Sequence, residues 1–93
     1  MVTIILTVHL NIPGIMSLKE KRRILKSLMT RLRNDFNISV AEVGDNDILR
    51  SAKIGAAVVS NSRRFGHEVA SKVMNRIEAS PDVLVMDFST EEY

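Results

Sequence analysis

The stretch Ser17-Leu-Lys-Glu-Lys-Arg-Arg-Ile-Leu-Lys-Ser-Leu28, continued by Arg31-Leu-Arg-Asn-Asp-Phe-Asn-Ile-Ser-Val-Ala-Glu42, decides the fold of this chain. Ser17 and Glu20 have the spacing of a capping box, which begins a helix by satisfying two free backbone amides. Apolar residues then recur with helical spacing, at Leu18, Leu25, Leu28, Met29, Leu32 and Phe36. We therefore predict a helix from Ser17 that runs directly into a strand at 38–43.

Three further segments have the pattern of strands. Residues 2–11 alternate strictly, which places one set of side chains on each face of a half-buried strand. The apolar face comprises Val2, Ile4, Leu6, Val8 and Leu10, and the other face Thr3, Ile5, Thr7, His9 and Asn11. Residues 54–60 are apolar on both faces, which is typical of a central strand, and residues 83–88 form the last strand.

A second helix is predicted between the last two strands. Asn61 or Ser62 supplies its cap, and Ser80-Pro81 ends it. Its apolar stripe comprises Phe65, Val69, Ala70, Val73, Met74 and Ile77. The acidic tail Glu91-Glu92-Tyr93 is expected to fray.

The order β-α-β-β-α-β predicts a ferredoxin-like α+β domain over residues 1–93. Right-handed crossovers place both helices on one face of a four-stranded antiparallel sheet, with the strands at 38–43 and 83–88 as exposed edges. The apolar face of the first strand is expected to lie under the helices, because a slip of one residue would bury Thr7 and His9 instead. The opposite sheet face keeps exposed apolar side chains, Ile5 among them.

The positive charge is concentrated in the first helix. Residues 17–36 hold seven Lys or Arg and two acidic residues, whereas the whole chain has a net charge of only +2. Lysine and arginine bind phosphates without special geometry. The candidate nucleic-acid-binding residues are therefore those that share the polar side of this helix, namely Lys19, Arg22, Arg23, Lys26 and Arg33. The alternative is a solvated face balanced by helix-spaced pairs, such as Glu20 with Arg23 and Arg31 with Asp35.

Three segments resemble the YlxP-like family of small bacterial proteins. They are Ser17-Leu-Lys-Glu-Lys-Arg22, Phe36-Asn-Ile-Ser-Val-Ala-Glu42 and Ala57-Val-Val-Ser60. The resemblance implies a ferredoxin-like fold, a cytoplasmic location and no established activity, in a family whose genes often lie beside translation and ribosome-maturation genes. Family members often carry tryptophan where this chain has Leu49.

Several kinds of chemistry find no support in the sequence. The chain has no cysteine, which excludes disulfides and thiolate ligands. His9 and His67 are each expected to be isolated surface residues, and the acidic group Glu42, Asp45 and Asp47 is expected to be a solvated turn. The loop at residues 11–16 lacks the arginine of an acylphosphatase-type phosphate cradle. We therefore expect no enzyme activity, no cofactor, no metal and no membrane association.

Two functions fit these observations. The first is a non-enzymatic accessory protein that contacts structured RNA or ribosomal particles through the basic face of the first helix. Base stacking on the sheet is not expected, because its central strands carry no aromatic residue. The alternative is a homodimeric interaction module or scaffold, which would use the open sheet face or the edge strands.

Overall fold

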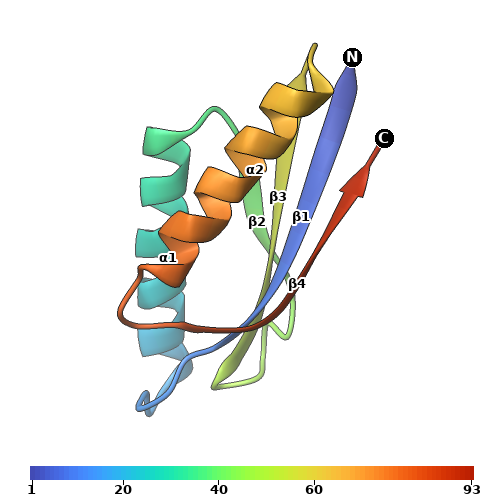
Figure 1. Cartoon of the computed structure of the whole chain (residues 1–93). Coiled ribbons are helices and arrows are strands. Elements are labelled where there is room, and N and C mark those ends of the chain that lie inside the picture. Colours follow the sequence, from blue (N-terminus) through green and yellow to red (C-terminus); the bar gives the residue numbers. More distant parts are fainter.

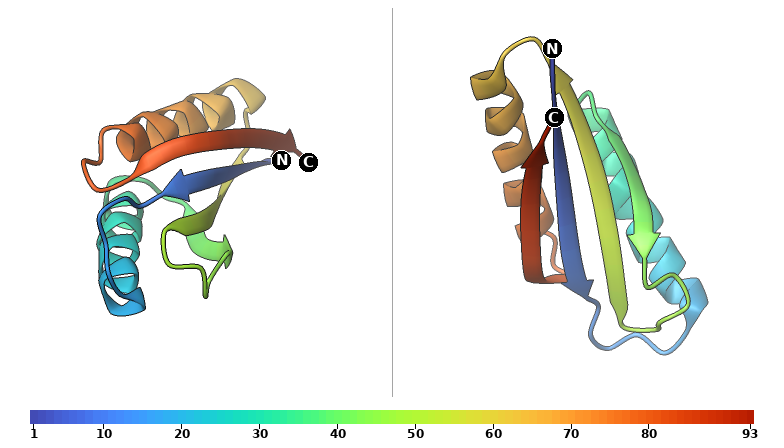
Figure 2. Two further views of the ribbon diagram at one scale, coloured as in Figure 1. Left: turned by 90° about the horizontal axis from the view of Figure 1, so that it is seen from below. Right: turned by 90° about the vertical axis from the view of Figure 1, so that its right-hand side faces the viewer.

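The computed structural model describes all residues, 1–93, and has the predicted element order. The elements are β1 (Val2–Asn11), α1 (Leu18–Asp35), β2 (Ser39–Gly44), β3 (Ser51–Ser60), α2 (Arg63–Glu78) and β4 (Leu84–Glu92). The strands form one antiparallel sheet in the order β2-β3-β1-β4, so β2 and β4 are its edges. Both helices lie on one face of this sheet (Figure 1), and the other face is open (Figure 2). The ferredoxin-like prediction is confirmed.

The alternation of β1 places its apolar face under the helices, as predicted. Ile4, Leu6, Val8 and Leu10 are at most 1% exposed, whereas Val2, near the end of the sheet, is only half-buried. On the open face, Thr7 lies opposite Gly55 and His9 opposite Lys53 of β3. The register therefore keeps polar side chains of β1 out of the core.

Both helices begin at the predicted serine caps. The Oγ of Ser17 accepts from the backbone N–H of Glu20 at 3.1 Å, and the Oγ of Ser62 accepts from that of Phe65 at 3.2 Å.

Neither helix is both long and apolar enough to cross a lipid bilayer.

The prediction that Phe65 lies in the core is wrong, because its side chain is 57% exposed. Gly66 is the buried residue of this turn, and a Cβ built on it would lie 3.1 Å from Cγ1 of Ile4. The backbone of the first turn of α2 therefore lies close to β1 at Gly66, and the side chain of Phe65 points toward solvent.

The prediction of a frayed acidic tail is also wrong. β4 extends to Glu92, and the backbone N–H and C=O of Tyr93 both bond to Thr3 of β1, each at 2.8 Å. Glu92 in addition contacts Arg63 and His67 of α2. The tail is ordered because β1 offers it a free edge along its whole length.

The two helices cover the sheet unequally. Phe88 of β4 pairs with Val8 of β1 and so lies on the helix-facing side, yet it is 53% exposed. Figure 2 shows that β4 forms the outer border of the sheet on the α2 side. The inner face of β4 is consequently only partly covered.

We predict that removal of Tyr93 lowers the free energy of unfolding by about 1–3 kcal/mol, because each of its two backbone hydrogen bonds with Thr3 contributes about 0.5–1.5 kcal/mol. Urea denaturation measures the change. Tyr93→Ala is the control, since it keeps both bonds and removes a side chain that is 71% exposed; its effect should stay within about 0.5 kcal/mol. A truncation without effect would show that the tail is not held.

Candidate nucleic-acid interface

The five candidate residues of α1 lie on one side of the helix and are exposed. At 3.6 residues per turn they fall within an arc of about 100°, turned away from the buried Leu25, Leu28 and Leu32. We call this set the basic stripe: Lys19, Arg22, Arg23, Lys26 and Arg33.

No residue of the basic stripe has a carboxylate within 4.0 Å of its side-chain nitrogens. The predicted pair Glu20 with Arg23 does not form. The predicted pair Arg31 with Asp35 does not form either, because Asp35 instead pairs with Arg76 of α2. On α2, by contrast, all three arginines are paired with acids: Arg63 with Glu92, Arg64 with Glu68, and Arg76 with Asp35. Unpaired positive charge is thus concentrated on α1.

Arg33 is the one member of the basic stripe that is anchored. Its Nη2 donates to the backbone carbonyl of Val40 at 3.0 Å. β2 is an edge strand, so this bond satisfies a carbonyl that no neighbouring strand reaches. The guanidinium keeps its charge and its remaining donors.

A sixth basic residue of α1, Lys21, points in the opposite direction. Lys21 lies on the apolar stripe of the helix and is fully buried. Its Nζ donates to the carbonyls of Asp45 at 2.6 Å, Ile48 at 2.8 Å and, more weakly, Asn46 at 3.4 Å. Lys21 therefore holds the loop between β2 and β3 against α1. The sequence does carry a signal of this burial, because Lys21 falls between Leu18 and Leu25 on the apolar stripe of the helix.

The charge of Lys21 is balanced by Glu42. Oε2 of Glu42 lies 3.1 Å from the Lys21 Nζ and has no other polar partner. Glu42 therefore pairs with the Lys21 ammonium. The acidic residues Glu42, Asp45 and Asp47 do not form a cluster that could bind a metal ion.

Leu49, at the position where the related family often has tryptophan, is half-buried against the core.

His9 is not isolated, contrary to the sequence prediction. Its Nε2 lies 2.8 Å from Oγ of Ser51, and this hydroxyl donates to Oδ2 of Asp45 at 2.7 Å. The Ser51 bond is the main cause of a lowered pKa at Asp45, and the charges of Lys53, His9 and Lys21 act in the same direction. The network joins β1, β3 and the β2–β3 loop on the open sheet face.

The prediction that His67 is isolated is wrong as well. Its Nε2 lies 2.9 Å from Oε1 of Glu92, and the hydrogen bond is the main cause of a lowered pKa at Glu92. Arg63 contacts the other carboxylate oxygen of Glu92 at 2.8 Å. These contacts join the end of β4 to α2. Neither histidine could have been paired from the sequence, because the partners are 25 or more residues away.

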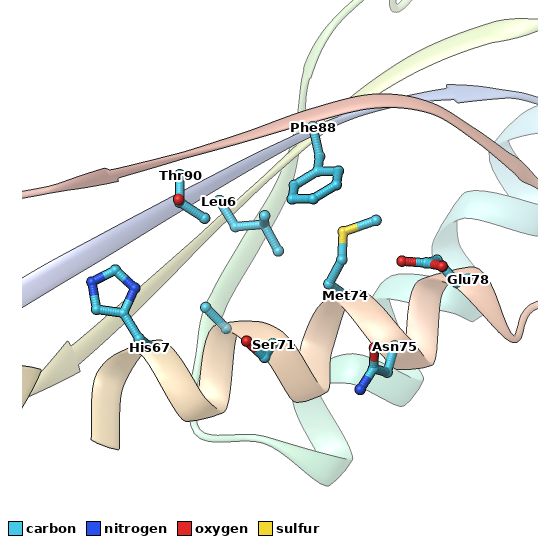
Figure 3. A pocket seen from close by; sticks show the side chains of 9 residues that line it. Leu6, His67, Ser71, Met74, Asn75, Glu78, Phe88 and Thr90 are labelled. Carbon is cyan, nitrogen blue, oxygen red and sulfur yellow. The ribbon is translucent and has the colours of Figure 1, made fainter. Parts of the chain in front are cut away.

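A groove of about 310 Å³ separates α2 from β4. Figure 3 shows the ring of Phe88 and the side chain of Leu6 facing Met74, with His67 toward one end and Glu78 toward the other. The groove arises because α2 does not cover the inner face of β4. The groove borders α2, whereas the basic stripe lies on α1.

Comparison with solved structures supports the fold class. The NMR structure of a de novo designed protein with the ferredoxin fold superimposes with a TM-score of 0.65 at 12% identity, covering 98% of this chain and 86% of that one. SnoaB, a cofactor-independent oxygenase from Streptomyces nogalater, superimposes with a TM-score of 0.55 at 7% identity, covering 98% and 90%. At such identities the likeness concerns the fold alone. The class is thus that of ferredoxin-like α+β domains.

The chain belongs to the family described as "Protein of unknown function (DUF503)", which matches residues 3–90. It is 39% identical over 67 residues to the uncharacterized protein YlxP of Bacillus subtilis (strain 168), an alignment that covers 72% of this chain and 73% of the relative. The resemblance to the YlxP-like family is confirmed. Membership carries no activity with it.

We predict that Lys21→Met lowers the free energy of unfolding by about 3–5 kcal/mol, because it leaves the Glu42 carboxylate without its partner charge. Lys26→Met, on the exposed side of the same helix, is the matched control and should change stability by no more than about 0.5 kcal/mol. Urea denaturation of both variants measures the difference. Equal effects would contradict the role given to Lys21.

We also predict that Ser51→Ala raises the pKa of Asp45 toward its ordinary value. Because the folded-state pKa is depressed, the network stabilises the protein above the ordinary carboxyl pKa, and this stabilisation is lost as the pH falls through the lowered value. The variant should therefore lose stability at neutral pH and less at acid pH. Carboxyl ¹³C NMR titration measures the pKa, with Ser39→Ala as the control on an exposed strand position. An unchanged Asp45 titration would contradict the assigned cause.

Proposed function

We propose that this protein is a non-enzymatic, cytoplasmic accessory factor that binds structured RNA, such as ribosomal RNA, through the phosphate contacts of the basic stripe. The observation that carries the proposal is the unpaired charge of α1. Lys19, Arg22, Arg23 and Lys26 form four pairs at spacings of three or four residues, and each pair of like charges costs about 0.2–0.5 kcal/mol. An anionic partner would relieve this repulsion.

One further cost and a comparison with α2 strengthen the inference. Lys19 lies in the first turn of α1, where the helix dipole disfavours positive charge by about 0.3–1 kcal/mol at low salt. α2 of the same protein avoids such a concentration by pairing its three arginines with acids. A charge distribution that weakens the free protein is understandable if a ligand uses it. The gene neighbourhood of the related family favours RNA as that ligand.

The non-enzymatic part of the proposal rests on the geometry of the Ser51 network. A nucleophilic serine gives its proton to a histidine that a carboxylate orients from its other ring nitrogen. Here the Ser51 hydroxyl donates to Asp45, and Asp45 lies nearer to Ser51 than to His9, whose Nε2 is 3.9 Å from Oδ2. This arrangement ties three segments together and directs the Ser51 proton to Asp45 instead of to His9.

A second candidate function is self-association or protein binding through the open sheet face. Val43 and Val59 are 58% and 63% exposed there, and a shallow apolar depression of about 280 Å³ lies beside Ile5, Ala41 and Ala57. Exposed apolar patches of this kind mark interfaces. This surface is on the side of the sheet opposite α1, so a homodimer would leave the basic stripe free.

We predict that Arg22→Glu/Lys26→Glu weakens binding to structured RNA at low salt by about tenfold or more, since two phosphate contacts are replaced by repulsion. Fluorescence anisotropy with a labelled ribosomal RNA hairpin at two salt concentrations measures the change. Arg64→Glu/Lys72→Glu makes the same change in net charge on α2 and is the matched control, which should bind nearly as the native protein does. RNA affinity that is absent at low salt, or equal in the two variants, would refute the RNA proposal in favour of the protein-binding one.

A further inference from the structure

We infer that the RNA element bound by the basic stripe is a double helix, contacted along its phosphate backbone without selection for sequence. This inference rests on the proposed function and names the class of RNA. The first support is the rigidity of the charged surface. α1 is an 18-residue helix, and two of its side chains fix it to the rest of the fold: Lys21 to the β2–β3 loop and Arg33 to Val40 of β2.

The second support is the straight and extended arrangement of the charges. At a rise of 1.5 Å per residue, Lys19 and Lys26 are separated by about 10.5 Å along the axis, and Lys19 and Arg33 by about 21 Å. A duplex is an equally stiff object with a dense line of phosphates. A flexible single strand would lose conformational freedom in following the same line.

The third support is the position of the aromatic residues. Single-strand binding is stabilised by bases stacked on exposed aromatic rings, worth about 1–3 kcal/mol per base. Phe88 faces the groove between α2 and β4, and Phe65 and Tyr93 are exposed on α2 and at the end of β4. Phe36, at the end of α1, is half-buried with the guanidinium of Arg76 over its ring. No exposed ring adjoins the basic stripe, so a single strand would gain charge contacts only.

Counterion release is the fourth support for the duplex. The logarithm of the affinity falls linearly with the logarithm of the salt concentration. The slope is about −0.9 per neutralised phosphate on a duplex and about −0.7 on a single strand. The four or five cations of the basic stripe therefore release more counterions from a duplex, with an expected slope of about −4.

The test compares two labelled RNAs of equal strand length by fluorescence anisotropy: a mixed-sequence duplex of about 20 base pairs and an unstructured single strand. We expect the duplex to bind about tenfold more tightly at the same salt, with a slope near −4, and a second duplex of unrelated sequence to bind within a few-fold of the first. Arg23→Glu/Lys26→Glu should remove most of this binding, whereas Phe88→Ala should change it less than twofold.

The outcomes separate the inference from the proposal beneath it. A single strand that binds as tightly as the duplex, with both sensitive to Arg23→Glu/Lys26→Glu, would overturn the duplex inference and leave RNA binding by the basic stripe intact. Strong preference for one duplex sequence would also overturn it. Failure of both RNAs to bind at low salt would overturn the proposed function itself.

Discussion

The buried ammonium of Lys21 is the interaction on which the arrangement of α1, β2 and the loop between β2 and β3 depends. A charged group in the interior is tolerated only when its hydrogen-bonding capacity and its charge are both satisfied. Three loop carbonyls and the Glu42 carboxylate meet these demands together. The requirement works in both directions, because loop carbonyls that face α1 also need donors.

This anchor explains several features of the loop. Asp45 has a φ of +59°, a conformation uncommon for a residue other than glycine, and its carbonyl makes the shortest of the Lys21 bonds. Its carboxylate then points to the open sheet face, where it accepts from Ser51. One residue therefore connects the ammonium under the helix to the polar network on the far side of the sheet.

The same helix carries both the anchor and the proposed RNA-binding surface. Lys21 and Arg33 attach α1 at two points, while Lys19, Arg22, Arg23 and Lys26 extend into solvent without acidic partners. α2 differs in each respect, since its arginines are paired and its groove-facing side is partly apolar. The charge asymmetry of the sequence thus becomes sharper in the structure, because the pairing on α2 removes most of its free positive charge.

The sequence by itself determined the element order, the serine caps, the register of β1 and the side of α1 that bears the basic stripe. These follow from local rules: period-two and period-3.6 patterns act within a few residues, and so do caps. It could not determine the partners of Lys21, His9, His67 or Glu92, nor the order of the tail, because those contacts join residues far apart in the chain. A lysine on an apolar stripe, a lone histidine and an acidic tail each have several possible environments, and only the packing of α1 and α2 on the sheet selected among them.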